Sequence, residues 1–167
     1  MAHTAYLGLG SNLGDRAANL LRAMTALIGG DLRLSGASSI YETEPVDVAE
    51  QPLFLNLVVA VTAPRLEPFS LLNYCLATET RLGRKRMIER GARTVDIDLL
   101  LLEDVVVDET RAGVELVLPH PRLHLRRFVL TPLAEVAPHL KHPVLGETMM
   151  HLLGAVEDQA AVRVYRD

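Results

Sequence analysis

The chain has 167 residues, of which 49% are apolar and 23% charged, and its formal net charge is −4. These values predict one globular domain, residues 1–167, and the acidic balance argues against general nucleic-acid binding. The N-terminus lacks the charged start and apolar run of a signal peptide, and no apolar stretch is long enough to span a membrane. A single cysteine, Cys75, excludes a disulfide framework. We therefore expect a cytoplasmic monomer without membrane or nucleic-acid partners.

The N-terminal part of the sequence predicts a strand, a helix and a second strand. Residues 5–9 form a short apolar run that is typical of a strand. After residues 10–15, apolar side chains recur at helical spacing as far as Ile28, where two glycines end the helix. Residues 32–41 predict the second strand.

Glycine recurs within residues 8–14 in a way that suggests a dinucleotide-binding loop. That motif requires a final glycine where Leu13 stands, and no Walker-type Gly-Lys-Ser/Thr follows. A turn followed by a helix cap explains Ser11, Asn12 and Asp15, so we favour a structural role for this segment.

The middle of the chain predicts a loop, a third strand and a second helix. Residues 43–52 contain two prolines and several acidic residues, and they are numerous enough to form a binding loop or lid. Residues 53–61 predict a strand, and Pro68 begins a helix that runs to about Leu82. Glu79, near the end of this helix, lies within two turns of the basic stretch that follows.

That basic stretch leads directly into two aspartates. Residues 81–93 carry six basic side chains against one acidic side chain, whereas residues 95–102 are apolar except for Asp96 and Asp98 and predict a fourth strand. Because successive strand side chains point to opposite faces, the two carboxylates share one face. A hard cation such as Mg²⁺ would relieve their repulsion, and the arginines suit the phosphates that complete its coordination. The pattern indicates phosphoryl transfer, although solvated charge explains the same residues without any function.

The C-terminal third predicts one further strand segment and two helices. Residues 105–107 are expected to pair beside the fourth strand. A second basic patch follows at 119–128. A helix is expected over 130–137, ending before a proline, and a last amphipathic helix over 147–156.

The order of these elements, βαββαβ, predicts the fold class. It favours an open, mainly antiparallel sheet covered by helices on one face, and a ferredoxin-like α+β sandwich is the simplest such layout. A doubly wound parallel sheet would need more alternation of strands and helices than this chain provides.

Several short motifs between about Ala5 and Leu153 recur in one known family. They are Gly10-Ser11-Asn12-Leu13, Tyr41–Val46, Phe54-Leu55-Asn56, Gly83-Arg84, Gly91–Leu99, Pro119–Arg122 and Arg126–Leu130. Through them the chain resembles the 6-hydroxymethyl-7,8-dihydropterin pyrophosphokinases of folate biosynthesis. The resemblance implies a ferredoxin-like fold and the transfer of diphosphate from ATP to the pterin hydroxymethyl group, with release of AMP.

The resemblance also implies roles for individual residues. Asp96 and Asp98 would hold two Mg²⁺ ions, and Arg84 and Arg93 would be catalytic, clamping the triphosphate and stabilising the transition state. The further ATP contacts that it implies are Glu79, Arg90, His120 and Arg126. The pterin contacts that it implies are Thr43, Pro45, Val46, Phe54, Asn56, Asp96 and Phe128. The amide of Asn56 can donate and accept at the edge of the heterocycle, and the two phenylalanines can sandwich its plane.

Other interpretations stay open at this point. The chain could be another metal-dependent phosphoryl or nucleotidyl transferase, or a non-catalytic ferredoxin-like domain that binds a ligand. Core packing alone would explain the phenylalanines. The chain also departs from the family pattern: Arg90 directly precedes Gly91 without the tryptophan that is frequent there, and Arg127 replaces a frequent glycine.

Overall fold

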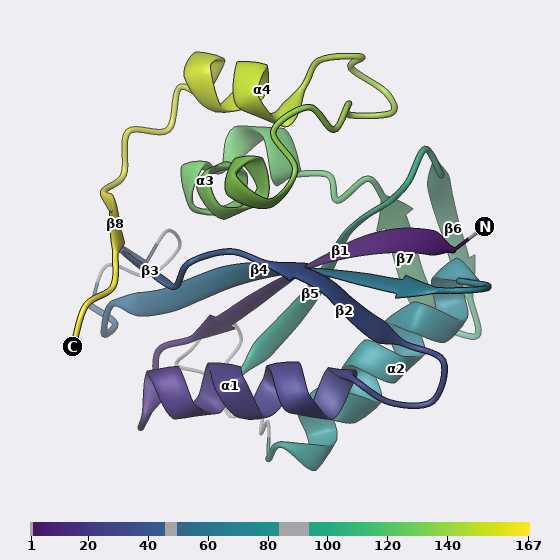
Figure 1. The fold of residues 1–167 in the computed structure, drawn as a ribbon, viewed down its shortest axis with the longest axis horizontal. Coiled ribbons are helices and arrows are strands. Elements are labelled where there is room, and N and C mark those ends of the chain that lie inside the picture. Colours follow the sequence, from purple (N-terminus) through teal and green to yellow (C-terminus); the bar gives the residue numbers. More distant parts are fainter. Residues whose placement is uncertain (1, 46–49, 84–93) are drawn as a thin grey trace.

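The computed structural model describes residues 2–45, 50–83 and 94–167 (Figure 1). Within these ranges, the predicted α+β class and antiparallel sheet are confirmed. The elements in chain order are β1 (His3–Ser11), α1 (Arg16–Leu27), β2 (Arg33–Ala37), β3 (Tyr41–Thr43), β4 (Phe54–Ala63), α2 (Pro68–Arg81), β5 (Asp96–Leu102), β6 (Val107–Arg111), β7 (Val114–Leu118), the 3₁₀ turn η1 (Leu123–Leu125), α3 (Arg127–Val136), α4 (Met149–Ala155) and β8 (Val162–Val164).

The main sheet has the strand order β5-β1-β4-β3-β8, with β2 also paired to β4, and its pairings are antiparallel. In the register of these strands, Gly10 of β1 lies opposite Asp96 of β5 and also opposite Asn56 of β4. Residues directly opposite each other in a sheet point to the same face. The register therefore brings a carboxylate and an amide, forty residues apart in sequence, to neighbouring positions on one face.

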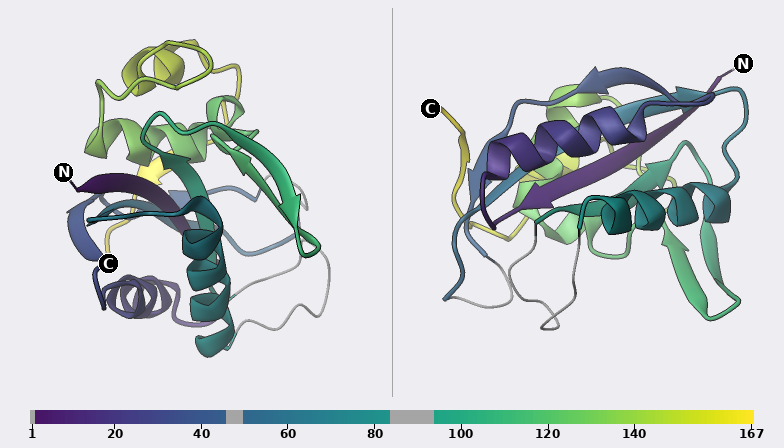
Figure 2. Two further views of the ribbon diagram at one scale, coloured as in Figure 1. Left: turned by 90° about the vertical axis from the view of Figure 1, so that its right-hand side faces the viewer. Right: turned by 90° about the horizontal axis from the view of Figure 1, so that it is seen from below.

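Helices cover both faces of this sheet, α1 and α2 on one and α3 on the other, and α4 packs on the outside of α3 (Figures 1 and 2). Along β4, Leu57 and Val59 belong to the core that includes α1 and α2, whereas Val58 belongs to the core that includes α3. The prediction that helices cover one face only is wrong, because β4 carries apolar side chains on both faces and both must be buried.

The first two predicted helices form where expected, and their starts are set by carboxylate caps. Asp15 accepts a hydrogen bond from the N–H of Ala18 (3.0 Å), which confirms the predicted cap of α1. Glu67 accepts one from the N–H of Ser70 (2.7 Å) at the start of α2. These bonds satisfy N–H groups that the first turn of a helix leaves unpaired.

The predicted strand over residues 32–41 is divided into β2 and β3 by Ser38. The N–H of Ser38 donates to the carbonyl of Val58 (2.9 Å), and its hydroxyl accepts from the N–H of Val58 (2.9 Å). A serine side chain thereby takes the place of a backbone carbonyl in the ladder, which interrupts the regular strand.

The prediction that residues 105–107 pair beside the fourth strand is wrong. β6 pairs instead with β7, a strand that the sequence analysis missed, and the two form a separate hairpin (Figure 2). The outer strand β6 is largely exposed and polar, so it lacks the apolar alternation by which a strand is recognised in sequence.

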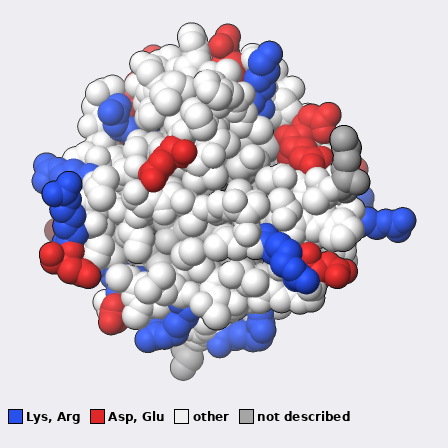
Figure 3. Space-filling view, viewed as in Figure 1, with Lys and Arg blue, Asp and Glu red and all other residues white. Residues whose placement is uncertain are grey.

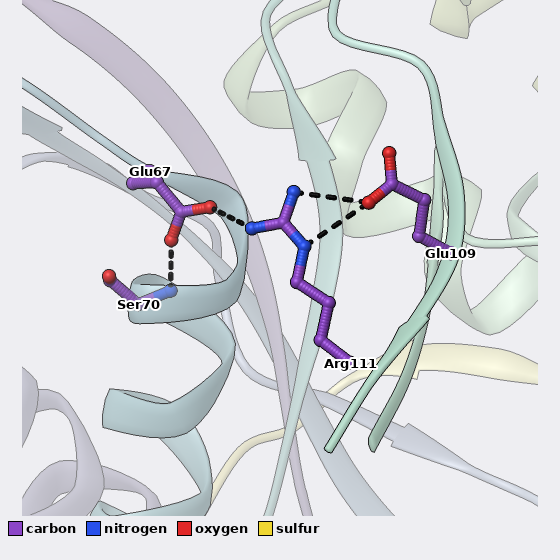
Figure 4. Close-up of polar contacts among 4 residues, drawn as sticks. All are labelled: Glu67, Ser70, Glu109 and Arg111. Carbon is purple, nitrogen blue, oxygen red and sulfur yellow. Dashed lines mark hydrogen bonds and ion pairs between the residues drawn. The ribbon is translucent and has the colours of Figure 1, made fainter. Parts of the chain in front are cut away.

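Arg111 connects this hairpin to the start of α2 (Figure 4). Its guanidinium forms ion pairs with Glu67 (3.1 Å) and Glu109 (3.1 Å) and lies 4.3 Å from the ring centroid of Phe69. The side chains are about half exposed, so each ion pair contributes little by itself, on the order of 0–1 kcal/mol.

The C-terminal part contains α3, α4 and the short strand β8. α3 begins at Arg127, earlier than the predicted Leu130, and α4 lies within the predicted range 147–156. None of the described helices is both long and apolar enough to cross a membrane. On the face shown in Figure 3, acidic and basic side chains of the described residues are interspersed with uncharged surface, which does not produce a strong field of one sign on that face.

Candidate active site

A cavity of about 370 Å³ lies among β1, β3, β4, β5 and the segment that leads into α3. Its volume falls in the range of small-molecule sites, roughly 300–1,000 Å³. The residues predicted from the sequence to bind metal, ATP or pterin that line it are Thr43, Pro45, Phe54, Asn56, Asp96, Asp98, His120, Arg126 and Phe128. Side chains predicted to bind metal, ATP and pterin therefore meet in one cavity.

Asp96 and Asp98 lie at the start of β5. Both line the cavity, whereas Ile97 between them is 3% exposed and belongs to the core. The prediction that the two carboxylates share one strand face is thus confirmed. Pairing with β1 fixes their backbone, with Asp96 opposite Gly10 and Asp98 opposite Gly8, and neither glycine has a side chain to fill the space beside them.

Asn56 lies across β1 from Asp96 and is almost completely buried. Its Nδ2 donates a hydrogen bond of 2.6 Å to the hydroxyl of Thr43, so one amide hydrogen is engaged by the protein. A Cβ atom at Gly10 would lie 2.8 Å from Asn56 Oδ1, so glycine is required there for this orientation of the amide. We call Asp96, Asp98 and Asn56 the strand wall.

His120 lies between β7 and η1, and its N–H donates to the carbonyl of Leu100 in β5 (2.8 Å). Burial, and then the charges of Arg126 and Arg122, lower the pKa of His120 from 6.5 to about 4, so the ring is neutral near pH 7. Its Nδ1 accepts the N–H of Arg122 (3.1 Å), which leaves the proton on Nε2. We call His120, Arg122 and Arg126, which all line the cavity, the basic wall.

Two aromatic side chains complete the cavity. Phe54 comes from the start of β4 and Phe128 from the first turn of α3. The guanidinium of Arg126 lies 5.5 Å from the ring centroid of Phe128, a cation–π contact that links the basic wall to an apolar surface.

The sequence matches the model of a protein family described as 7,8-dihydro-6-hydroxymethylpterin-pyrophosphokinase (HPPK) over residues 6–138. The chain belongs to the HPPK family. It is an ATP-dependent pyrophosphokinase that transfers diphosphate to the hydroxymethyl group of the dihydropterin in folate biosynthesis, as the resemblance implied.

Two relatives illustrate how far the similarity to the HPPK family extends. The chain is 42% identical over 161 residues to the 2-amino-4-hydroxy-6-hydroxymethyldihydropteridine pyrophosphokinase of Methylorubrum extorquens, covering 96% of this chain and 98% of the relative. It is 38% identical over 168 residues to the enzyme of the same name from Bacillus subtilis, covering 99% and 92%. The similarity therefore includes nearly the whole of both enzymes.

The fold agrees with that of solved HPPK structures. The crystal structure of wild-type HPPK-DHPS from Plasmodium falciparum matches with a TM-score of 0.74 at 17% identity, covering 92% of this chain. The chain spans 44% of the length of that protein. This likeness confirms the predicted ferredoxin-like α+β fold.

Glu79, expected from the HPPK resemblance to contact ATP, is not among the residues that line the cavity. Its side chain is 3% exposed, and Oε1 accepts the N–H of Ile97 (2.7 Å) in β5, the strand at the end of the sheet. Glu79 thus supports the backbone between Asp96 and Asp98. Its proposed contact with ATP stays a prediction.

Four predicted site residues lie outside the described parts of the chain. They are Val46, Arg84, Arg90 and Arg93. Their assignments therefore rest on the sequence and on the HPPK resemblance.

The cavity also contains residues that the sequence analysis did not assign to the site, among them Glu44, Gln51 and Arg122. Gln51 accepts a hydrogen bond from Asn12 Nδ2 (2.9 Å), so the buried segment after β1 helps to hold the loop before β4. Arg122 lies in the second basic patch, and that charge was the available signal. Nothing in the sequence indicated Gln51, because its hydrogen-bond partner, Asn12, is distant in sequence.

The strand wall fits the Mg²⁺ that the HPPK resemblance implies. Its two carboxylates are hard oxygen ligands that face one cavity. Among the described residues, no group of three or more His, Cys, Asp or Glu side chains could hold a metal by themselves. A carboxylate pair suits an ion that keeps open positions for substrate phosphates, as Mg²⁺ does in kinase sites.

Proposed function

We propose that the cavity is the site of diphosphate transfer, with Asp96 and Asp98 as the Mg²⁺ ligands and the basic wall as part of the ATP site. The observation that carries this proposal is the register that sets Asp96, Gly10 and Asn56 side by side on one sheet face. A metal-binding carboxylate then lies next to a buried amide suited to a heterocycle. The reacting ends of both substrates would therefore meet at this point.

Two Mg²⁺ ions held by these carboxylates would neutralise charge on the transferred phosphates. The basic wall would act on the same phosphates. Arg126 supplies a permanent positive charge, and His120 supplies an uncharged Nε2–H donor, since its pKa of about 4 keeps it neutral. We assign Arg84, Arg90 and Arg93 to ATP as well, with Arg84 and Arg93 in the catalytic roles that the family resemblance implies.

The pterin part of the proposal rests on Asn56 and the aromatic side chains. With one amide hydrogen bound to Thr43, Asn56 can offer its Oδ1 and its second N–H to the pterin edge. Phe54 and Phe128 supply flat surfaces for the ring, and Thr43, Pro45 and Val46 supply backbone contacts. Such an arrangement would select a planar heterocycle whose edge both donates and accepts hydrogen bonds.

The chemistry requires little beyond positioning. The hydroxymethyl oxygen attacks the β-phosphorus of ATP, the bond from that phosphorus to the α–β bridging oxygen breaks, and AMP leaves with this oxygen. The hydroxyl proton passes to solvent. Holding the oxygen in line with the breaking bond, in a cavity that balances the phosphate charge, accounts for the acceleration.

The test is to incubate the protein with ATP, Mg²⁺ and 6-hydroxymethyl-7,8-dihydropterin and to quantify AMP and the pterin diphosphate. We expect equal amounts of both products, none when the pterin is omitted, and none when EDTA is present. ATP consumption that yields ADP, or AMP formation that EDTA does not affect, would contradict the proposal.

We also propose that the enzyme acts as a monomer in the cytoplasm. The described residues of one chain line the cavity from several sides, and Cys75 is a free, buried thiol. Burial, and then the carboxylates of Glu79 and Asp98, raise the pKa of this thiol to about 12, so it is unreactive at neutral pH. Sedimentation of the active protein at assay concentration tests the monomer.

A further inference from the structure

The C-terminal segment, residues 156–165, contacts two parts of the cavity wall that are distant in sequence. It leaves α4 and ends as β8 alongside β3 (Figure 1), and on the way Asp158 contacts the start of α3. The HPPK family match ends at residue 138, so this segment lies outside the matched range.

The first contact is a helix cap made by Asp158. The residue before α3, Arg126, makes no side-chain cap of its own. Instead, Oδ2 of Asp158 accepts the N–H of Arg127 (2.9 Å), and Oδ1 accepts the N–H of Ala160 (2.9 Å). A carboxylate at this position satisfies an otherwise unpaired N–H and interacts favourably with the helix dipole.

The capped N–H belongs to the residue between two cavity-lining residues. Arg126 and Phe128 lie on either side of Arg127, and the guanidinium of Arg126 lies 5.5 Å from the ring centroid of Phe128. The position of this N–H therefore sets where both side chains enter the cavity.

The second contact is with β3. Val162 pairs with Thr43, and the N–H of Tyr165 donates to the carbonyl of Ile40 (2.8 Å). Thr43 in turn accepts the hydrogen bond from Asn56. The segment that caps α3 is thus also fixed to the strand that orients the proposed pterin-binding amide.

We propose that Asp158 is a positioning residue of the active site. By capping α3 from a segment anchored on β3, it fixes Arg126 and Phe128 relative to Thr43 and Asn56. The inference rests on the proposed roles of Arg126 toward ATP and Phe128 toward pterin. Asp158 touches neither substrate and acts through the two side chains that flank the capped N–H.

The experiment compares Asp158→Ala with the matched control Gln159→Ala. Gln159 belongs to the same segment, but among the described residues its side chain donates to carbonyls of that segment alone, at Val156 and Glu157. We expect Asp158→Ala to raise KM for ATP and for the pterin by about 2- to 30-fold, with little change in kcat. These factors correspond to the usual free-energy cost of losing a helix cap, if that cost falls on substrate binding. The control should leave both KM values unchanged.

A variant with both Arg126→Ala and Phe128→Ala separates positioning from a purely structural role. In that background Asp158→Ala should raise neither KM further, because the side chains through which it acts are gone. Asp158→Asn, which keeps one acceptor oxygen in place of two, should restore most of the affinity. If Asp158→Ala folds poorly, the smaller rise in KM expected for Asp158→Asn is compared in the two backgrounds instead, and it should be absent where Arg126 and Phe128 are replaced.

Two results would overturn the inference in distinguishable ways. The inference is wrong, and the proposed function stands, if Arg126→Ala and Phe128→Ala raise KM but Asp158→Ala does not. The same holds if Asp158→Ala raises KM equally when the side chains of Arg126 and Phe128 are both removed. If Arg126→Ala and Phe128→Ala change neither KM, the proposed roles of those residues fail, and the inference fails with them.

Discussion

The two walls of the cavity differ in how their side chains are held. The strand wall stands on β4 and β5, where backbone pairing with β1 fixes every residue. The basic wall stands on the irregular segment between β7 and α3, where single hydrogen bonds such as that from His120 to Leu100 fix it. The side chains that we propose to hold the metal and the pterin thus lie on the sheet, and those that we propose to contact the phosphates lie on a loop.

The spacing within the strand wall illustrates this difference. Residues two apart on a strand are separated by roughly 7 Å along it, whatever the conformations of their side chains. The backbone of β5 therefore fixes the separation of the Cα atoms from which the two carboxylates of Asp96 and Asp98 project. The basic wall instead places an arginine, a neutral imidazole and a second arginine on a short turn, with long side chains that can follow a substrate.

The largest effect is predicted for the strand wall. Asp96→Asn or Asp98→Asn should lower kcat by at least about a hundredfold, because a bound metal contributes several kcal/mol to stabilisation of the transition state. The fold should persist, since each substitution preserves side-chain volume and removes one of two like charges. The rate of AMP formation at saturating Mg²⁺ measures kcat, and circular dichroism shows whether the fold persists.

Asp108→Asn is the matched control for this pair. Asp108 lies in the exposed strand β6 and does not line the cavity, so its substitution should leave kcat unchanged. Activity near that of the parent protein in both strand-wall variants would contradict the assignment of Asp96 and Asp98 as metal ligands.

The strand wall was also the part of the site most open to prediction. Alternation of Asp96 and Asp98 with apolar residues sufficed to place both carboxylates on one face. Their proximity to Asn56 could not be predicted, because it depends on a register that passes through Gly10, and register is a property of three strands together.

Other features could not be predicted because they depend on a single side chain, on a very short element or on a residue distant in sequence. The break between β2 and β3 depends on the hydroxyl of Ser38, which strand propensity does not describe. β8 has three residues, too few to show the alternation of apolar and polar side chains by which a strand is recognised in sequence. The cap on α3 comes from Asp158, thirty-one positions after the N–H that it satisfies. Helices and long strands were predictable because each repeats one pattern over many residues.

The next effect concerns substrate selectivity within the strand wall. Asn56→Ala should raise KM for the pterin by about 5- to 150-fold, since loss of a partner in a buried site costs roughly 1–3 kcal/mol. Binding of ATP alone should change little. Calorimetric titration with each ligand separately checks this, and an equal loss for both ligands would instead indicate a general structural role for Asn56.

Glu79 tests how the strand wall is supported. Glu79→Ala leaves the buried N–H of Ile97 without the acceptor at 2.7 Å, which should cost roughly 1–3 kcal/mol of unfolding free energy. Urea unfolding measures this cost, with Thr80→Ala, an exposed neighbour on α2, as the control. Unchanged stability together with weaker ATP binding would favour the direct ATP contact that the family resemblance implies.

The last effect is a pH dependence within the basic wall, and it is absent near pH 7. Because the pKa of His120 is lowered to about 4 in the folded protein, its neutral form stabilises the fold at pH above about 6.5, and that contribution is lost as pH falls toward 4. His120→Gln should therefore lose less stability than the parent protein between pH 6.5 and 4, as followed by Tm. Parallel Tm curves for the two proteins would exclude this role for His120.

The most direct test of the difference between the walls is the Mg²⁺ dependence of nucleotide binding. An unreactive ATP analogue is titrated by calorimetry, with and without Mg²⁺, into the parent protein and into the double variant Asp96→Asn/Asp98→Asn. We predict that Mg²⁺ strengthens binding to the parent protein, and that the double variant loses this gain while still binding the metal-free analogue through its basic wall. An equal gain from Mg²⁺ in both proteins would contradict the assignment of the strand wall as the metal site.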